Sequence, residues 1–352
     1  MVGLRRAREG ITASVARNGG WTRVGSRRHF RYLDGRGKRI TDPAKLERIH
    51  ELAIPPAWKE VWISAGASSK LQATGVDAAG RKQYIYHPNF RAQQEQAKFD
   101  RLIRFAERLP DLRAAMSEHM DHDLLDRERV SAIATRLINC GWFRVGTERY
   151  AKESKTFGIT TLRKDHVRVR GHRIAFDFRG KHGSVVRTTL VDQELADAIR
   201  ELLALPRSGR LFRYGWDGGL CALTGPKLND YVRAYLGEEF TAKDFRTWGG
   251  TLIAAIALAE RGPAETEADA KRAITAVMRT VGKQLGNTPA VARNSCVSPA
   301  VIDQYLGATT IEDFRPRHLR VVGARDLGLD REEQALLSLL RSWRIKHSRA
   351  AA

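Results

Sequence analysis

Residues 167–190 read VRVRGHRIAFDFRGKHGSVVRTTL, and this stretch decides the fold class. Apolar and polar residues alternate along three short runs, at 167–170, 173–178 and 184–190, and such alternation is typical of half-buried strands. Glycines lie at the corners between the runs, where the chain must turn. The stretch therefore predicts a small three-stranded sheet, with Lys181 at the tip of one hairpin.

Helical periodicity surrounds this sheet. Apolar residues recur at spacings of three and four in seven ranges, namely 93–108, 124–138, 192–204, 226–236, 242–260, 264–285 and 331–345. The small sheet is therefore expected to lie within a region that is mostly helical.

The first ninety residues have a different character. Strand patterns occur at 29–33, 58–63, 71–76 and 81–87. One helix is expected to begin at Asp42-Pro43 and to end before Pro55-Pro56. We therefore predict an α+β protein in which a small strand-rich N-terminal domain gives way, near residue 90, to a larger and mostly helical domain.

The charge of the chain indicates a polyanionic partner. Among 352 residues, Lys and Arg total 61 against 40 for Asp and Glu, which gives a formal net charge of +21. Such an excess favours nucleic acid, because each phosphate contact releases counterions. A merely soluble basic protein is the alternative, and no basic amphipathic helix or lipidation motif favours a membrane surface.

Apolar stretches and cysteines point to a reducing compartment. The longest apolar stretch, 252–259, is too short to span a bilayer, and the N-terminus lacks the apolar segment of a signal peptide. The three cysteines are odd in number, far apart and outside any C-x-x-C pair, which argues against disulfides and structural zinc. We expect a cytoplasmic protein associated with the nucleoid.

Four segments of the helical region each hold one polar residue in a setting that needs explanation. They are WFRVG (142–146), GKHG (180–183), KDFRTW (243–248) and GNTP (286–289), and their polar residues are Arg144, Lys181, Arg246 and Asn287. An arginine within an apolar run must find an anionic partner or remain hydrated, because a buried unpaired charge is costly.

Each of these residues alone has an ordinary structural explanation. The explanations are an ion pair of Arg144 with Glu148, a solvated hairpin tip for Lys181, a helix cap or a pair with Asp244 for Arg246, and a turn for Asn287. The order of the four segments is more specific than any one of them.

That order resembles the type IB DNA topoisomerases, in particular the compact poxviral and bacterial enzymes. The resemblance runs from about residue 29 to about residue 310 and includes IPPAW (54–58) and GRKQYIY (80–86). It implies a catalytic core of the type IB topoisomerase and tyrosine recombinase kind, and a DNA clamp for the strand-rich domain. Residues 1–28 are rich in Arg and Gly with little periodic apolar content, so we expect a basic flexible arm there. The expected parts are this arm, a β-rich DNA-clamp domain at 29–90, the catalytic core at 91–346 and a tail at 347–352.

The resemblance also implies an activity and a set of roles. Family enzymes relax supercoiled DNA without ATP or an obligatory metal: a tyrosine cuts one strand, keeps the 3′ phosphate and later reseals the strand, so no cofactor is expected. Arg144, Arg246 and Asn287 would hold the non-bridging phosphate oxygens, since guanidiniums bind such oxygens well. Lys181 would be the general acid for the leaving 5′ oxygen, and Lys243 a secondary phosphate contact.

Four further residues match family positions that face DNA: Gln83, Tyr84, Tyr86 and Tyr150. Tyr84 and Tyr86 are expected on one face of a strand and Gln83 on the other, because side chains alternate along a strand. Packing is the alternative role for the tyrosines. The implied partner is duplex DNA, contacted mainly through its phosphate backbone by a monomer that clamps it.

The chain departs from the family at the nucleophile. The family tyrosine lies nine residues after the Asn287 position, and here that place is occupied by Cys296. Three interpretations remain open. The chain is a cleavage-defective member that acts as a duplex DNA-binding protein, or the Cys296 thiolate attacks. In the third, Tyr305 replaces the missing nucleophile, although it lies nine residues later in a helical pattern that is typical of a core residue.

Two other enzyme classes fit less well. A tyrosine recombinase would carry His-x-x-Arg where this chain has KDFR (243–246). A metal-dependent nuclease could use the ligand types in one short polar stretch, His119, Asp121, His122 and Asp123, but such a stretch is usually a solvated loop. No metal site is predicted.

Overall fold

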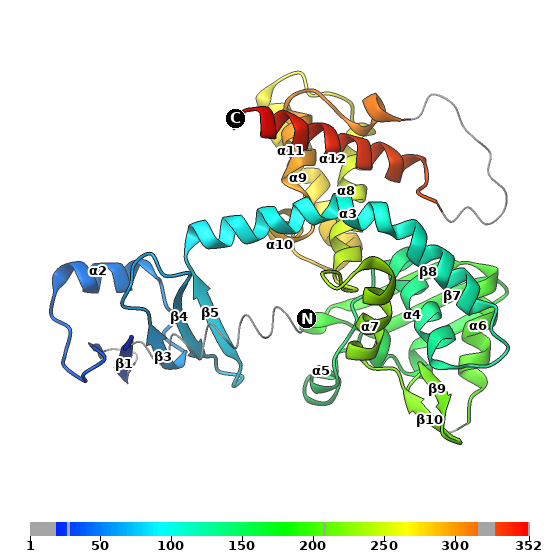
Figure 1. The fold of residues 1–352 in the computed structure, drawn as a ribbon, viewed down its shortest axis with the longest axis horizontal. Helices are drawn as coiled ribbons and strands as arrows, with labels where there is room; N and C mark the ends of the chain where they lie inside the picture. Colours follow the sequence, from blue (N-terminus) through cyan, green and yellow to red (C-terminus); the bar gives the residue numbers. More distant parts are fainter. Residues whose placement is uncertain (1–18, 27–28, 207–208, 316–327, 351–352) are drawn as a thin grey trace. The chain divides into compact units, whose positions relative to one another are not determined.

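The computed structural model describes residues 19–26, 29–206, 209–315 and 328–350 (Figure 1). The chain folds as two compact units that divide between Lys98 and Phe99. This division falls inside one long helix, α3 (Pro88–Met120). The predicted α+β class is confirmed, since an antiparallel sheet dominates the first unit and helices dominate the second.

The N-terminal unit is built on a five-stranded antiparallel sheet in the order β2-β1-β3-β4-β5. Its elements are β1 (Trp21–Ser26), β2 (His29–Leu33), α2 (Pro43–Glu51), β3 (Lys59–Ile63), β4 (Leu71–Val76) and β5 (Lys82–Tyr86). Asp42 caps α2 by accepting a hydrogen bond from the Ala44 amide at 3.0 Å, and Pro43 starts the helix. A small core of buried apolar side chains, including Ile49 and Ile63, joins the helix to the sheet.

Strand β1 corrects the prediction of a flexible arm over 1–28. Trp21 is buried in the core of the N-terminal unit, which holds the strand in the sheet. Arg23 lies 4.2 Å from the ring centroid of Phe30 and donates hydrogen bonds to the carbonyls of Ile54, Pro55 and Trp58. The arm prediction failed for Trp21–Ser26 because these contacts are distant in sequence. The rest of it, 1–18 and 27–28, lies outside the described residues.

The predicted three-stranded sheet is present in the C-terminal unit. Strands β6 (Val167–Arg170), β7 (Arg173–Arg179) and β8 (Val185–Val191) pair antiparallel in that order. Their inward side chains join the main core, and helix α6 (Gln193–Ala204) packs on this side. The ring centroids of Phe143 and Phe176 lie 4.9 Å apart, so the sheet packs against the segment that follows helix α4 (Arg127–Gly141).

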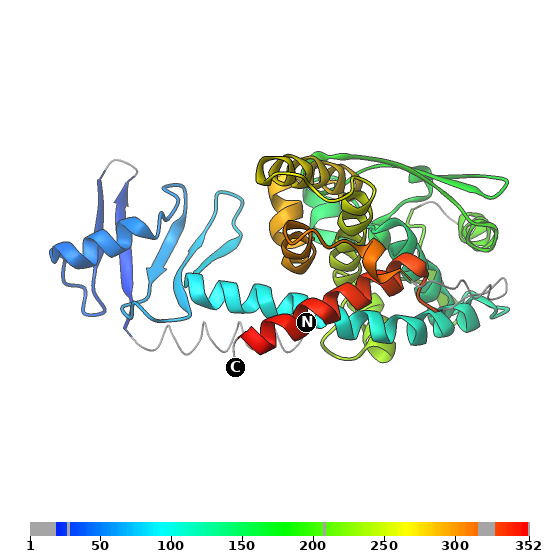
Figure 2. The same ribbon diagram turned by 90° about the horizontal axis from the view of Figure 1, so that it is seen from above.

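The remaining elements of the C-terminal unit are mostly helices (Figures 1 and 2). They are α4 (Arg127–Gly141), α5 (Glu148–Glu153), α7 (Gly225–Leu236), α8 (Asp244–Ala259), α9 (Glu267–Leu285), α10 (Pro289–Ser295), α11 (Pro299–Leu306) and α12 (Arg331–Ala350). A two-stranded hairpin, β9 (Arg213–Trp216) and β10 (Gly219–Ala222), was not predicted. None of the helices described is long and apolar enough to cross a membrane.

Two helices extend beyond their predicted ends. Helix α3 continues through Pro110 to Met120, because the buried side chains of Leu109, Leu112 and Met116 prolong its apolar stripe. Helix α12 continues to Ala350, so the predicted tail at 347–352 is wrong as far as residue 350. His347 stacks on Trp343 at a centroid distance of 3.9 Å and thereby extends the last turns.

Candidate active site

Arg144 follows the C-terminal end of helix α4. Trp142 caps this helix in the left-handed conformation, with φ of 50°, and so turns the chain. Phe143 then enters the core, while Arg144 stays half-buried at its edge. The Arg144 carbonyl accepts a hydrogen bond from the Ile159 amide at 2.8 Å, which fixes this loop.

Arg246 lies in the first turn of α8 and joins the ends of two other helices. Its Nη1 donates to the Trp142 carbonyl and its Nη2 donates to the Leu285 carbonyl, the latter at 2.6 Å. Both acceptors are orphan carbonyls at helix C-termini, which favour a cation. The guanidinium therefore holds the ends of α4 and α9 next to each other.

Asn287 follows a left-handed glycine cap, Gly286, with φ of 59° at the end of α9. Its Oδ1 accepts a hydrogen bond from Arg144 Nη2 at 2.6 Å, and its Nδ2 donates to Cys296 Sγ at 3.4 Å. Arg144 Nη2 also donates to the Gly286 carbonyl at 3.0 Å. Asn287 thus connects Arg144 to Cys296, which is buried at the end of α10.

The two arginines of this cluster repel each other. Burial and the charge of Arg144 lower the pKa of Arg246 to about 10, and burial lowers the pKa of Arg144. Within the described chain, no carboxylate forms an ion pair with either residue. The alternative pairings with Glu148 and Asp244 are not formed. Glu148 pairs with Arg210, and Asp244 pairs with Arg101 at 3.7 Å and accepts hydrogen bonds from Thr241. Two uncompensated guanidiniums favour an anionic ligand.

Adjacent glycines in α8 make room for the cluster. A Cβ added at Gly249 would lie 2.1 Å from Trp142 Nε1, and one added at Gly250 would lie 2.6 Å from the Cys296 carbonyl oxygen. The sequence analysis did not single out this pair. The signal was present, since two adjacent glycines inside an apolar helix are costly without a packing reason.

Lys181 is not brought into the hydrogen-bonded cluster. It lies exposed at the tip between β7 and β8, where His182 has a φ of 61° and the Gly180 amide donates to the Ser184 carbonyl at 2.7 Å. No described residue forms a hydrogen bond or an ion pair with its ammonium group. Lys243 is exposed directly before α8, and Tyr150 on α5 is 40% exposed.

The tyrosines of β5 share one face, as expected. The rings of Tyr84 and Tyr86 are stacked, with centroids 6.1 Å apart and planes 13° apart. Gln83 donates instead from Nε2 to Asp77 Oδ2 at 2.8 Å, at the neighbouring turn.

Two alternatives from the sequence find no support. Tyr305 is buried in the core, and its hydroxyl donates to the Gly262 carbonyl at 3.1 Å, so it is a structural residue of α11. His119 bonds to the Tyr231 hydroxyl at 2.8 Å, and His122 pairs with Asp126 at 2.7 Å. In the part of the chain that the structure describes, no three acidic, His or Cys side chains gather as metal ligands.

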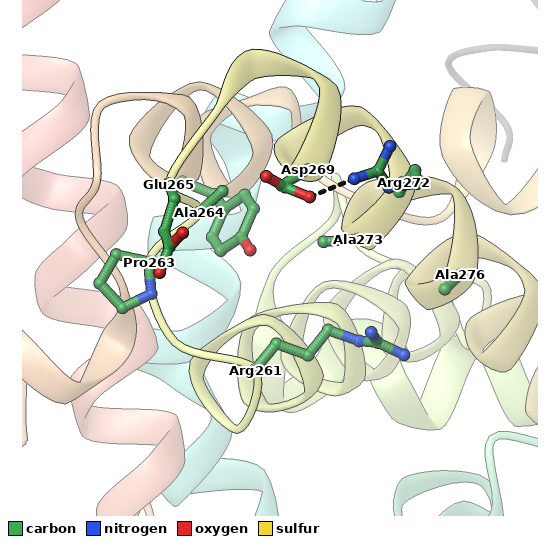
Figure 3. Close-up of a pocket in the computed structure, with 9 residues that line it drawn as sticks. Arg261, Pro263, Ala264, Glu265, Asp269, Arg272, Ala273 and Ala276 are labelled. Carbon is green, nitrogen blue, oxygen red and sulfur yellow. Dashed lines mark hydrogen bonds and ion pairs between the residues drawn. The ribbon is translucent and has the colours of Figure 1, made fainter.

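A pocket beside α9 is separate from the cluster (Figure 3). It is lined by Arg261, Pro263, Ala264, Glu265, Asp269, Arg272, Ala273, Ala276 and Tyr305. Asp269 and Arg272 form an ion pair along one wall of it, on α9, so its charges are partly compensated. None of the sequence-predicted phosphate-binding residues lines this pocket.

Two known families match consecutive parts of the chain. Residues 87–312, more than half of the chain, match the family described as eukaryotic DNA topoisomerase I, catalytic core. Residues 29–77 match the bacterial DNA topoisomerase IB N-terminal domain. The chain belongs to the type IB DNA topoisomerase family.

Individual relatives include viral and plant proteins. DNA topoisomerase 1B of Acanthamoeba polyphaga mimivirus is 34% identical over 268 residues, which cover 74% of this chain and 80% of the relative. DNA topoisomerase 1B of Vaccinia virus (strain Copenhagen) is 26% identical over 147 residues, 40% of this chain and 46% of the relative. DNA topoisomerase 1 beta of Arabidopsis thaliana is 25% identical over 213 residues, 58% of this chain and 22% of the relative.

Proposed function

We propose that this protein binds duplex DNA and carries the phosphate-binding site of a type IB DNA topoisomerase, which relaxes supercoils by cutting and resealing one strand. One observation supports this most directly: Arg144 and Arg246 lie close together beside Asn287, and no carboxylate among the described residues pairs with either guanidinium. A scissile phosphate would supply the missing negative charge. Its developing trigonal-bipyramidal transition state gains charge on the non-bridging oxygens, which is where guanidinium donors act best.

The proposed chemistry divides between position 296 and Lys181. A tyrosine hydroxyl at position 296 would release its proton to water and attack phosphorus, so that a new P–O bond forms as the bond to the 5′ oxygen breaks. The Lys181 ammonium would give its proton to that oxygen. Lys181 is exposed at a hairpin tip, which leaves its ammonium group accessible to a ligand. Resealing reverses both steps, so no cofactor is consumed.

The remaining predicted contacts would position the duplex. Tyr84 and Tyr86 offer one stacked aromatic face, and Lys243 and Tyr150 are exposed on the C-terminal unit. We propose that these residues and Gln83 contact DNA, chiefly at phosphates and sugars, and that a monomer suffices. Contacts of this kind set the register of the protein on DNA and add little sequence preference.

A second candidate function follows from Cys296. A thiolate reacts poorly at phosphodiesters, and the cysteine side chain is several ångströms shorter than that of tyrosine. Asn287 donates a hydrogen bond to its sulfur at 3.4 Å, so the residue fills the place beside the arginines. A protein with this site and no phenol would bind duplex DNA without cutting it.

Relaxation of supercoiled plasmid separates the two functions. We expect Cys296→Tyr to relax plasmid without ATP or Mg²⁺, because the phenol restores a competent nucleophile next to Arg144 and Arg246. Cys296→Phe is the matched control, since it adds the ring without the hydroxyl and should leave plasmid supercoiled. Denaturation of Cys296→Tyr reactions should also trap protein on the 3′ end of the cut strand.

The unchanged chain decides between the candidates. Relaxation by the Cys296 protein supports the topoisomerase, whereas duplex binding without relaxation supports the binding protein. If folded Cys296→Tyr binds DNA and relaxes none, the site assignment is wrong.

A further inference from the structure

The arginines of the proposed phosphate site have hydrogen-bond donors that the protein does not use. A guanidinium carries five N–H donors. Arg144 donates twice from Nη2, to the Gly286 carbonyl and to Asn287 Oδ1. Arg246 donates once from each Nη, to the carbonyls that end α4 and α9. Three N–H donors therefore remain on each guanidinium, and none of the described residues accepts a hydrogen bond from them.

The charge of these two arginines is also unbalanced. Both side chains are half-buried, and no carboxylate of the described chain pairs with either. Burial and the charge of Arg144 lower the pKa of Arg246 only to about 10, so this side chain stays charged at neutral pH. Two fixed positive charges are balanced better by a ligand with two negative charges than by a ligand with one.

Cys296 fills little of the space that a tyrosine would need beside these arginines. The thiol interacts electrostatically with both guanidiniums, so it lies next to them. Its Sγ is one bond beyond Cβ, and within the described chain it accepts one hydrogen bond, from Asn287 Nδ2 at 3.4 Å. The cysteine therefore brings no oxygen to the position from which a tyrosine hydroxyl would attack phosphorus.

We propose that the ligand held most tightly at this site is a nick in duplex DNA whose 3′ end carries a phosphate. This proposal deepens the function proposed above and rests on its phosphate site. A phosphodiester inside a strand has two non-bridging oxygens and one negative charge. A terminal phosphate has three such oxygens and a charge of about −1.5 to −2 at pH 7, so it uses more of the remaining donors and balances both guanidiniums.

The polarity of the nick follows from the proposed chemistry. In that chemistry the phosphate stays on its 3′ sugar while the bond to the 5′ oxygen breaks. A nick with a 3′-phosphate and a 5′-hydroxyl therefore places phosphorus where the scissile phosphate would lie, and the unbroken strand keeps both ends in place. A phosphate monoester has no activated bond to the protein, so the chain would hold this break without resealing it.

Four duplexes of one sequence test the proposal on the unchanged chain. One is intact, and three share a nick with a 5′-hydroxyl and carry a 3′-phosphate, a 3′-hydroxyl or the methyl ester of the 3′-phosphate. The methyl ester keeps phosphorus in place but has two non-bridging oxygens and one negative charge, as an intact strand has. Fluorescence anisotropy should give a dissociation constant for the 3′-phosphate nick at least about tenfold below the other three, the effect of one further charge-assisted hydrogen bond.

Matched variants locate this preference. Arg144→Gln removes one guanidinium of the site and should abolish most of the preference for the 3′-phosphate. Its affinity for the 3′-hydroxyl nick should change little, because many other phosphates contribute to duplex binding. Arg272→Gln is the control, since Arg272 pairs with Asp269 on α9, and it should keep the preference. Thermal unfolding reports whether each variant is folded, and the comparison of the four duplexes on the unchanged chain needs no variant.

Several results would overturn the proposal and leave the proposed function intact. Equal affinity for the 3′-phosphate nick and its methyl ester would mean that the second charge adds nothing. A preference that folded Arg144→Gln retains would place the phosphate at other residues. A nick with a 5′-phosphate and a 3′-hydroxyl that binds as tightly would mean that added charge counts and polarity does not. Failure of the unchanged chain to bind any of the duplexes would instead contradict the proposed function, and this proposal with it.

Discussion

At the scale of single residues, Arg246 contributes both structure and charge. Its guanidinium donates two hydrogen bonds, to the carbonyls of Trp142 and Leu285, and its positive charge is repelled by that of Arg144. A lysine has one compact ammonium and cannot reproduce this forked geometry. The residue is therefore expected to be sensitive to a substitution that preserves its charge.

We predict that Arg246→Lys, in the Cys296→Tyr background, slows single-turnover cleavage of a duplex by roughly 10²–10³-fold, the usual effect of losing one transition-state donor. Duplex affinity should change much less, because many phosphates share the binding energy. Cleavage rates and binding isotherms measured on the same duplex check this split. An unchanged cleavage rate would remove Arg246 from the site.

At the scale of elements, α8 supports the site through its glycines. Alanine is a better helix former than glycine by about 1 kcal/mol, so Gly250→Ala would stabilise an isolated helix. Here its Cβ would lie 2.6 Å from the Cys296 carbonyl oxygen and 3.0 Å from Leu285 Cδ1. We predict a net loss of about 1–2 kcal/mol in the free energy of unfolding, since overpacking outweighs propensity.

Urea denaturation measures this loss for Gly250→Ala. Gly219→Ala is the control, because the nearest atom to its added Cβ is the Trp216 carbonyl oxygen at 3.7 Å. Stabilisation by Gly250→Ala would mean that the 296 segment does not pack on α8 as described.

Helix α4 ends just before Arg144, and its N-terminus is capped by Asp126, whose ionisation contributes to the stability of the fold. Asp126 Oδ1 accepts from the Arg129 amide at 2.7 Å, and Oδ2 is 2.7 Å from His122 Nδ1. Burial alone would raise the pKa of Asp126, but these two hydrogen bonds outweigh it and lower the pKa below 3.8. A lowered carboxyl pKa stabilises the folded state above the unfolded value, and this contribution disappears as the pH falls through the folded value.

We predict that Asp126→Ala lowers the free energy of unfolding by about 1 kcal/mol at neutral pH, the typical cost of losing an N-cap. The difference from the unchanged protein should stay constant above about pH 5 and shrink progressively at lower pH, as first the unfolded and then the folded carboxyl takes up a proton. Denaturation at a series of pH values measures it. Asp126→Asn keeps a cap without the charge, so its smaller effect should vary less with pH.

The sequence predicted elements well where periodicity was local and poorly where long-range contacts decide. Strands β6 to β8 follow from alternation alone, whereas β1 depends on Trp21 and on Arg23 reaching carbonyls more than thirty residues away. Helix α3 passes Pro110, which a local rule takes as a stop. The order of Arg144, Arg246 and Asn287 indicated one site, but their hydrogen bonds and the glycines of α8 required the structure.

At the scale of the whole molecule, the net charge of +21 governs DNA binding. Neutralised phosphates release counterions, so the logarithm of the observed affinity should fall linearly with the logarithm of salt concentration. With about 6–10 phosphate contacts, affinity should fall by roughly 10³–10⁵ between about 50 and 200 mM salt. Each arginine removed from a phosphate contact should reduce the slope by about 0.9.

The salt dependence of duplex affinity also distinguishes the effect of net charge from the effect of arginines and lysines that contact phosphate. Titrations of one duplex at several salt concentrations should give the same slope for the unchanged chain and for a control variant with Arg108, Arg272 and Arg341 replaced by Gln, since these three arginines pair with carboxylates. Lys243→Gln should reduce the slope by about one contact if Lys243 touches phosphate. A flat salt response of the unchanged chain would contradict phosphate-based binding, because no arrangement of guanidiniums on a polyanion escapes counterion release.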